Sequence, residues 1–315
     1  MTAGRGAADP VRPLTQTPAK PHSLRLGRTY LPYLYVLPAV VTLGVFIYWP
    51  LVQVVRLSFY QWNLLGLKTW LGNENYVRLA RDPDLGPLLL QSLLYILLAL
   101  VGNFLLPVGL AMLTMQVTRR AVTVYQSLLF TPAVISTTVG ALLWQWIYLP
   151  TGGPLNKFLS VFGIGGINWL NDQNSALLAV SLATSWKFLG FNYLIALAGF
   201  SSLPTEPLEA ARIDGAVGWS LLKDIIIPLL APTLMFLGLT TILQALPNTF
   251  VPIQILTRGG PSDASTNLLY AVYQDAFQFF QVGKGSAKAV ILMLMLGGFA
   301  VLQFRLLERN LEYDR

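Results

Sequence analysis

Six long apolar stretches constrain the fold of this chain more than any other feature of its sequence. They lie at about residues 33-57, 88-115, 122-149, 176-200, 229-256 and 287-307. A helix needs roughly 20 apolar residues to cross about 30 Å of hydrocarbon. Only 11% of the residues are charged, against roughly 25% in a typical soluble domain. The sequence therefore predicts an all-α membrane protein with six transmembrane helices.

Prolines interrupt several of these stretches. A proline lacks the N–H of a helical hydrogen bond, and a membrane helix tolerates it where neighbouring helices or cavity water satisfy the freed carbonyl. The prolines within or beside the predicted spans are Pro38, Pro50, Pro107, Pro132, Pro232, Pro247 and Pro252. So many kinks favour a bundle with an internal passage over a simple lipid-facing anchor.

The first 28 residues differ from the rest of the chain. They are rich in proline, arginine and lysine and show no apolar period, a composition typical of disorder. A cleaved signal peptide would need an apolar core close to the N-terminus, but the first apolar run starts only near Tyr33. We therefore expect a basic, disordered cytoplasmic tail over residues 1-28 and one transmembrane domain over residues 29-315.

The distribution of lysine and arginine indicates the orientation, because basic residues concentrate in cytoplasmic loops. The Arg119-Arg120 pair, in a very short loop between the second and third predicted spans, is the sharpest marker. With that loop in the cytoplasm, both termini are cytoplasmic. The polar segment 201-228, between the fourth and fifth spans, then also faces the cytoplasm.

Several kinds of chemistry lack the residues they require. The chain has no cysteine, and its one histidine, His22, lies in the tail, so the apolar body has no histidine for catalysis or for binding a transition metal. There is no glycine-rich phosphate loop of the Walker type. The net charge of +7 follows the loops of a membrane protein and does not point to nucleic acid. Any ATP and magnesium would therefore bind partner subunits.

The acidic residues bear on two alternative functions. A polytopic membrane enzyme, such as a lipid-phosphate transferase, would need clustered carboxylates or histidine at the membrane surface, and the carboxylates here are scattered. A proton-coupled carrier usually places carboxylates within its helices, and none lies in the middle of a predicted span. Both functions stand as alternatives at this point.

The segment between the fourth and fifth spans has the pattern of two short helices joined by a sharp turn. Thr205 can cap the first helix, and Glu206 and Glu209 would complement the positive end of its dipole. Gly215 can take the left-handed conformation that ends a helix. A second, apolar-faced helix would then run up to Pro228. The simplest reading is an ordinary loop between two membrane helices.

The spacing within this segment resembles the cytoplasmic motif of ABC-importer permeases, which reads Glu-Ala-Ala, three residues, Gly, nine residues and Ile-x-Leu-Pro. Ile227 stands where that family usually has leucine, and the other fixed positions match. In that family the segment docks into a cleft on the ATP-binding subunit. The resemblance implies ATPase-coupling roles for Glu209, Ala210, Ala211, Asp214, Gly215, Ile225 and Pro228.

Physical reasons support these roles. Ala210 and Ala211 are small enough for a close approach to a partner surface, and Glu209 can offer a charge-assisted hydrogen bond. Asp214 can brace the turn. The alternative is that Glu209 and Asp214 are solvated surface residues.

The resemblance extends over nearly the whole chain after the tail. It includes, in order, Leu37-Pro38, Tyr48-Trp49-Pro50, Leu57-Ser58-Phe59, Gly72-Asn73-Glu74-Asn75-Tyr76, Trp186, Gly190-Phe191-Asn192, Leu256-Thr257-Arg258-Gly259-Gly260-Pro261, Tyr270, Ala276-Phe277 and Gly283. Together these are similar to the carbohydrate-uptake permeases. Residues 266-270 and the ending Gln303-Phe304-Arg305 are closer to the glycerol-3-phosphate branch than to the maltose branch.

This resemblance implies a permease subunit of an ABC importer in the bacterial cytoplasmic (inner) membrane, with a sugar or a glycerol-3-phosphate-type compound as solute. The implied partners are a second, similar permease, two ATP-binding subunits that hold ATP and magnesium, and an extracytoplasmic substrate-binding protein. The chain itself would carry no cofactor, metal site or catalytic residue.

Polar side chains within the spans are candidates for the solute pathway. Lys187 lies about midway along the fourth span, where a cation costs on the order of 2.5 to 3.5 kcal/mol. It can face a cavity and attract an anion such as a phosphorylated polyol, or it can extend to the headgroups.

The uncharged candidates are Asn192, Gln244, Asn248, Gln145 and Trp144, with Asn103 and Gln254 as further polar residues in spans. Each amide can bind a solute hydroxyl or a neighbouring helix. Gln244 and Asn248 share a helix face, and Trp144 can stack on a sugar ring or anchor its helix at the membrane interface.

Overall fold

The computed structural model describes residues 26–115 and 117–311. The chain divides into two compact units, Met1–Val52 and Gln53–Arg315. The described part of the first unit is helical and comprises α1 (Leu26–Leu43), the π-helical turn η1 (Gly44–Tyr48) and the start of α2 (Trp49–Leu57). The predicted tail lies outside the described residues up to Arg25, and its last three residues are helical rather than disordered.

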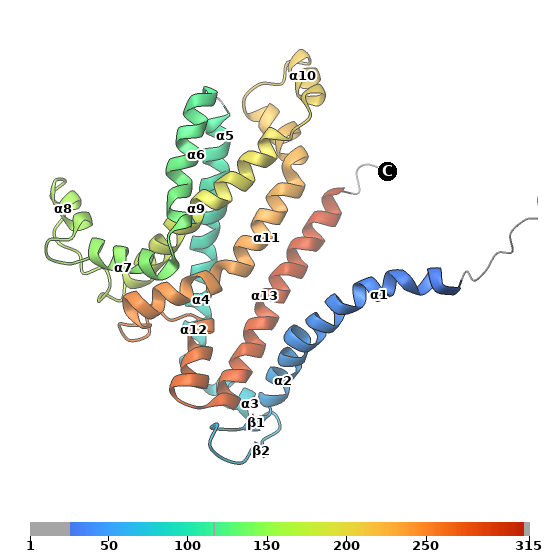
Figure 1. The fold of residues 1–315 in the computed structure, drawn as a ribbon. Helices are drawn as coiled ribbons and strands as arrows, with labels where there is room; N and C mark the ends of the chain where they lie inside the picture. Colours follow the sequence, from blue (N-terminus) through green and yellow to red (C-terminus); the bar gives the residue numbers. More distant parts are fainter. Residues whose placement is uncertain (1–25, 116, 312–315) are drawn as a thin grey trace, which may run out of the picture. The chain divides into compact units, whose positions relative to one another are not determined.

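Helices also make up nearly all of the second unit (Figure 1). The described part contains one antiparallel strand pair, β1 (Tyr60–Gln61) and β2 (Thr69–Trp70). Its helices and π-helical turns (η) are α3 (Glu74–Arg81), α4 (Leu85–Leu100), η2 (Val101–Leu105), α5 (Leu106–Thr114), α6 (Arg119–Val134), α7 (Thr137–Ile147), α8 (Pro154–Ser160), α9 (Ala176–Ser201), α10 (Thr205–Ile213), η3 (Leu221–Ile226), α11 (Ile227–Pro252), η4 (Ile253–Thr257), α12 (Leu268–Tyr273), η5 (Gln274–Gln278) and α13 (Val282–Leu311).

Four helical stretches of the described chain are long and apolar enough to cross a membrane alone. They are Tyr33–Leu57, Leu85–Thr114, Leu221–Thr257 and Val282–Arg305. Two further pairs of helices are long and apolar enough when each pair is taken together, although each pair is bent at a short break. These pairs are Arg120–Val134 with Thr137–Ile147, and Ala176–Ser201 with Thr205–Ile213. The predicted fold class, an all-α membrane protein with up to six spans, is confirmed.

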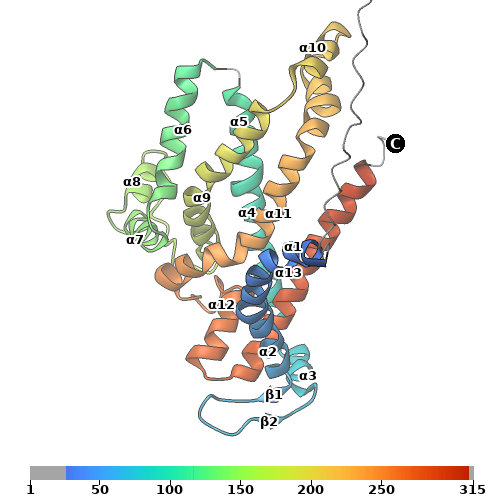
Figure 2. The ribbon, with the colours of Figure 1, turned by 45° about the vertical axis from the view of Figure 1, so that its right-hand side comes forward.

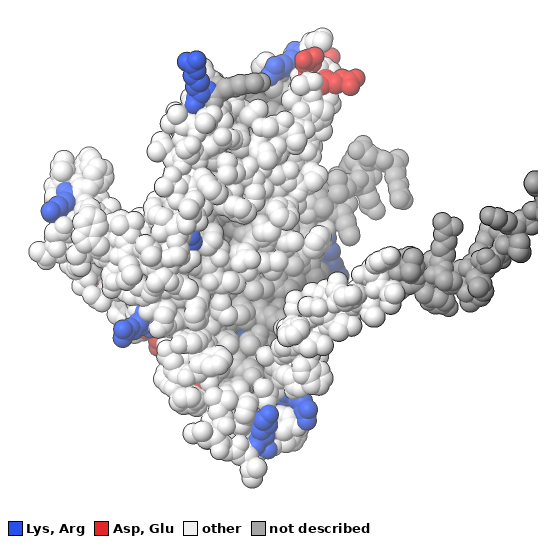
Figure 3. All heavy atoms as spheres, in the orientation of Figure 1, with Lys and Arg blue, Asp and Glu red and all other residues white. Residues whose placement is uncertain are grey.

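Charged side chains gather toward the two ends of the face shown in Figure 3, with few of them between. Figures 1 and 2 place α10 at one end of the second unit, beside the end of α5 and the start of α6, and place the β1–β2 pair at the opposite end. A weakly charged belt between two charged ends is what hydrocarbon requires of a protein that crosses it.

The third predicted span, 122-149, contains a sharp break between α6 and α7. The axes of α6 and α7 differ by 100°. Pro132 lies in the last turn of α6, and Ile135 after it is extended. Ser136 then starts the new helix, because its hydroxyl accepts a hydrogen bond from the Val139 N–H at 3.3 Å. A cap of this kind satisfies a donor that would otherwise be orphaned at the start of a helix.

Most of the π-helical turns accompany prolines. η1, η2 and η3 each end two residues before a proline, at Pro50, Pro107 and Pro228, and η4 follows Pro252 directly. A proline cannot donate to the carbonyl four residues earlier and its ring collides with it. The wider π turn takes up this conflict without ending the helix. The kinks predicted from the prolines are thus largely absorbed as local turns.

Helix α9 packs against α5, α6 and α11 at the centre of the second unit. Gly190 makes the contact with α6 possible. A Cβ at Gly190 would overlap the Leu129 carbonyl and lie 2.8 Å from the Phe130 Cα. Next to it, Tyr193, Leu197 and Leu237 are buried in one apolar cluster. Small residues that let backbones approach are the usual means of packing helices in a membrane.

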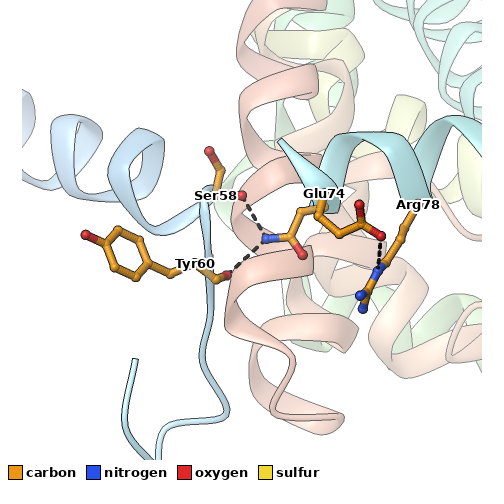
Figure 4. A network of polar contacts seen from close by, with 5 residues as sticks. Ser58, Tyr60, Glu74 and Arg78 are labelled. Atoms are coloured by element: carbon orange, nitrogen blue, oxygen red, sulfur yellow. Dashed lines mark hydrogen bonds and ion pairs between the residues drawn. The ribbon is translucent and has the colours of Figure 1, made fainter. Parts of the chain in front are cut away.

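A polar network organises the end opposite α10. The amide of Asn75 donates to the carbonyls of Ser58 at 2.8 Å and Tyr60 at 3.0 Å (Figure 4). The Tyr76 and Ser58 hydroxyls lie 2.6 Å apart. Gly283 packs so closely here that a Cβ would overlap the Tyr60 carbonyl. The residues of the Gly-x-x-Asn-Tyr pattern therefore tie the strand after α2 to the start of α13.

Two ion pairs join α13 to this end. Lys284 lies 3.3 Å from Asp82, at a partly exposed position. Lys288 lies 2.8 Å from Asp275, with only 11% and 7% of the two side chains exposed. The second pair is withdrawn from solvent, so its two charges depend on one another.

The Asp82 pair predicts a pH dependence of stability. The hydrogen bond from the Asp84 N–H, assisted by Lys284, holds the pKa of Asp82 below its ordinary value of 3.8, although partial burial acts in the opposite direction. A lowered pKa in the folded state adds stability above pH 3.8, and this stability is lost as the pH falls through the folded-state pKa. We expect acid to lower the melting temperature of Asp82→Asn less than that of wild type.

Thermal unfolding in detergent at pH 6 and pH 3.5 measures this effect. Asp84→Asn is the matched control, because it removes a carboxylate and keeps the backbone donor. An Asp82→Asn protein as acid-sensitive as the control would contradict the prediction.

Candidate functional site

The turn after α10 is a complete helix C-terminal motif. Gly215 has a φ of 87°, which glycine adopts without strain. The Ala216 N–H donates to the Ala211 carbonyl at 2.9 Å, and the Gly215 N–H donates to the Arg212 carbonyl at 3.1 Å. These are the two hydrogen bonds of the Schellman motif. We call α10, this turn and the residues up to Trp219 the elbow. The backbone hydrogen bonds of the turn fix its shape.

The elbow presents most of its side chains to solvent. Glu209, Ala210 and Asp214 are exposed, whereas Ala211 is buried. Large apolar side chains also project from it, since Ile213 is 85% exposed, Val217 72% and Trp219 71%. In a segment at the charged end of the unit, this combination suits a surface that another protein covers.

The elbow is joined directly to a membrane helix. Helix runs without interruption from Leu221 through η3 and α11 to Thr257, a length of 37 residues, or roughly 55 Å at the helical rise. Thr241, Gln244 and Asn248 lie on this helix and line a cavity. One element therefore reaches from the exposed elbow to an internal site.

The cavity has a volume of about 500 Å³. Its walls come from α4 with η2, from α6, from α9 and from α11. Polar groups from these helices converge on it, namely Tyr95, Asn103, Ser181, Thr184, Ser185, Lys187, Asn192, Thr240, Thr241, Gln244, Asn248 and Thr249. Among the described residues that line it, Lys187 alone is charged.

Lys187 is held at the break between α6 and α7. Its ammonium donates to the Ala133 carbonyl at 3.3 Å and to the Ile135 carbonyl. The last carbonyls of a helix lack intrahelical partners and carry the negative end of its dipole. The broken span thus supplies the partners of a cation that would be costly inside a membrane.

Asn103 joins three helices at the cavity wall. Pro107 cannot donate to the carbonyl of residue 103, four positions before it. That carbonyl instead accepts from the Asn192 amide at 2.6 Å and from the Thr241 hydroxyl at 3.4 Å. The proline in one helix therefore provides an acceptor for side chains of α9 and α11.

Comparison with known proteins identifies the family. Residues 104–313 match the family model described as "Binding-protein-dependent transport system inner membrane component". The chain belongs to this family. It is therefore a membrane-spanning permease subunit of an ABC importer, which removes the membrane enzyme and the proton-coupled carrier as alternatives.

Relatives of the permease extend over nearly its full length. It is 35% identical over 290 residues to the sn-glycerol-3-phosphate transport system permease protein UgpA of Brucella abortus, with 90% of this chain and 97% of that protein covered. The UgpA of Yersinia enterocolitica is 33% identical, with 91% and 97% covered.

Solved structures confirm the permease fold. A crystal structure of a bacterial ABC transporter involved in the import of the acidic polysaccharide alginate contains a chain similar to this one, with a TM-score of 0.77 and 22% identity. The match covers 90% of this permease and 96% of that chain. The same kind of transporter in complex with an alginate pentasaccharide-bound periplasmic protein gives a TM-score of 0.74 at 21% identity.

The structure brings together four of the six residues predicted for the solute pathway. Lys187, Asn192, Gln244 and Asn248 line the cavity of the permease. Trp144 and Gln145 do not. The ring of Trp144 packs between Tyr148 and Trp186 in the core, at centroid distances of 5.0 and 5.9 Å, and Gln145 is exposed on α7. The break between α6 and α7 turns this part of the chain away from the cavity.

Asn103 and Tyr95 also line the cavity, together with a group of serine and threonine hydroxyls that the sequence predictions missed. A periodic signal was present. Thr184 lies three positions before Lys187, and Thr240 and Thr241 lie four and three before Gln244. Such spacings place the hydroxyls near the same helix faces as the amides and the lysine.

The coupling segment differs from prediction at the start of its first helix. Thr205 does not cap α10, because Pro204 occupies the cap position and Thr205 is already helical. Glu206 lies in the first turn, but Glu209 lies beyond it. Pro228 lies in the first turn of α11, where the predicted second helix meets the span, and η3 continues into α11 without a break. The half-buried Ile225 and the exposed Pro228 therefore belong to the continuous helix.

Proposed function

We propose that this permease moves a small polyol phosphate of the sn-glycerol-3-phosphate type, or a sugar, through the cavity between α4, α6, α9 and α11. The observation that carries the proposal is the unbroken helix from the elbow to the cavity wall. The names of the relatives support the solute class. The single positive charge among the described residues of the cavity suits an anion.

In this proposal the elbow at α10 faces the cytoplasm, with both chain termini on the same side, and docks on an ATP-binding subunit. The chain lacks a Walker-type phosphate loop, so two partner subunits bind ATP and magnesium. A second, similar permease completes the pathway, and an extracytoplasmic binding protein delivers the solute. Closure of the ATPase pair would tilt α10, and the continuous helix would move the cavity wall.

Replacing Gly215 with proline tests the docking role. Proline fixes φ near −65°, whereas Gly215 has a φ of 87°, so the elbow cannot close as it does now. We expect the Gly215→Pro permease to reach the membrane but to lose ATPase co-purification and solute uptake by roughly 10- to 100-fold, since such backbone strain amounts to about 1 to 3 kcal/mol.

Gly163→Pro is the matched control for this experiment. Gly163 has a φ of 75°, and as at Gly215 an added Cβ would have no neighbour within 4 Å, but Gly163 lies in the loop after α8. Normal ATPase association of the Gly215→Pro permease, or equal losses in both variants, would count against docking at α10.

A further inference from the structure

We propose that Lys187 and Asn103 form a two-point recognition site in the cavity, for a solute with an anionic group at one end and a hydroxyl group at the other. This inference deepens the proposed function and rests on it. It assigns the anion to the Lys187 ammonium and the hydroxyl to the side-chain carbonyl oxygen of Asn103. The ligand class is a phosphate monoester of a small polyol.

Lys187 has one donor to spare. An ammonium group carries three N–H donors, and two of them go to the carbonyls of Ala133 and Ile135. The described residues contain no carboxylate within ion-pair distance of Lys187. Its charge is therefore met by helix carbonyls and by the Phe188 ring, whose centroid lies 5.7 Å from the ammonium, and its side chain lines the cavity. An anion that enters the cavity gains an uncompensated cation already fixed in position.

Asn103 supplies the second point. It is only 5% exposed, and its Oδ1 is buried without a hydrogen-bond partner. Its backbone carbonyl is fixed by Asn192 and Thr241, so the residue is anchored while the side-chain acceptor is left over. A buried acceptor without a donor costs about 1 to 3 kcal/mol. A solute hydroxyl that donates to this oxygen would remove that cost.

The two points lie beside the same helix at the cavity wall. Lys187 and Asn192 both lie on α9, and five residues of helix correspond to roughly 7.5 Å. Asn192 contacts the backbone carbonyl of Asn103 directly, so the anion point and the hydroxyl point both lie beside α9, on neighbouring turns, and both residues line the cavity. Gln244 and Asn248 on the facing wall can bind further hydroxyls.

The opposing explanation is that Lys187 only caps the end of α6. Glutamine separates the two roles. It keeps N–H donors for the Ala133 and Ile135 carbonyls but has no charge, so a capping role survives Lys187→Gln and anion recognition does not. Arginine keeps the positive charge, so anion recognition should survive Lys187→Arg. For Asn103, leucine removes the acceptor at nearly constant volume, and aspartate places a negative charge at the hydroxyl point.

The test uses the complete importer in proteoliposomes, with binding protein saturated with sn-glycerol 3-phosphate. Uptake per ATP hydrolysed is measured together with the melting temperature of each variant. We expect Lys187→Gln to lower uptake roughly 10- to 100-fold, the value of one charge-assisted hydrogen bond, with a melting temperature near that of wild type. Lys187→Arg should retain more uptake, and Asn103→Leu and Asn103→Asp should lower it, the aspartate more strongly.

Lys157→Gln, an exposed lysine at α8, is the matched control and should transport normally. If the Lys187→Gln importer takes up sn-glycerol 3-phosphate as well as the wild-type importer does, the two-point site is overturned and the proposed function still stands. A fall in the melting temperature of Lys187→Gln parallel to its fall in uptake would show that uptake is lost together with the structure, and it would also overturn the two-point site. If the wild-type importer fails to take up sn-glycerol 3-phosphate in an ATP-dependent manner, both the proposed solute and the site are wrong.

Discussion

Replacing Lys288 with methionine is expected to destabilise the permease by about 3 to 5 kcal/mol, the usual effect of breaking a buried ion pair. Lys288 and Asp275 lie 2.8 Å apart and are almost fully withdrawn from solvent. Methionine fills a similar volume, so the loss comes mainly from the Asp275 carboxylate left buried without its cation. Denaturant or thermal unfolding of the purified permease measures the effect.

Two variants define the cause of this loss. The double variant Asp275→Leu with Lys288→Met should recover most of the stability, because no uncompensated charge remains. Glu74→Ala breaks the pair with Arg78, whose Nε lies 3.0 Å from the Glu74 Oε1 (Figure 4). The side chains of this pair are 44% and 63% exposed, respectively. Glu74→Ala should cost no more than about 0.5 kcal/mol. Equal losses for the two pairs would show that burial is not the reason.

Gly190→Ala is expected to be the second most damaging change, with a loss of about 3 kcal/mol or more, at the upper end of overpacking effects. The added methyl group would overlap the backbone of α6 at Leu129. Backbone atoms cannot rotate away as a side chain can, so α6 and α9 would have to separate. The measurement is the melting temperature and the yield of monodisperse permease in detergent.

Gly140→Ala is the matched control, because Gly140 is also a buried helical glycine. A Cβ there meets only the Trp186 ring, at 3.8 Å, an ordinary contact. Alanine also has a better helix propensity than glycine, by roughly 1 kcal/mol. We therefore expect Gly140→Ala to be neutral or stabilising. A Gly190→Ala permease as stable as wild type would show that α6 and α9 are not closely packed.

The sequence predicted the fold class because apolar length is a strong signal in a membrane protein. It failed where the chain bends within an apolar stretch. Pro132 marks such a place, but Pro232 and Pro247 lie inside the continuous α11, so proline alone does not distinguish a break from a tolerated kink. The difference at residues 135 and 136 depends on a serine that caps a new helix and on a lysine from another helix that binds the freed carbonyls.

The candidate site was predictable in part for a similar reason. Lys187 and the amides of Asn192, Gln244 and Asn248 are polar groups that hydrocarbon would reject, so their placement at a cavity follows from their chemistry. Trp144 carries no such constraint, and its ring packs in the core. The role of Asn103 depends on Pro107 and on side chains about 90 and 140 positions away. Such a contact cannot be read from one sequence.

The single helix from Leu221 to Thr257 carries the elbow at one end and the cavity wall further along, and it keeps these two surfaces apart. Its elbow end and its cavity end are separated by roughly 28 Å of helical rise between Leu221 and Thr240, and the described structure shows no side chain shared by both. Substitutions that change which solute the cavity accepts can therefore accumulate at one end of the helix without changing how the permease binds its ATPase at the other. One ATPase could in this way serve several permeases that differ in the solute they transport.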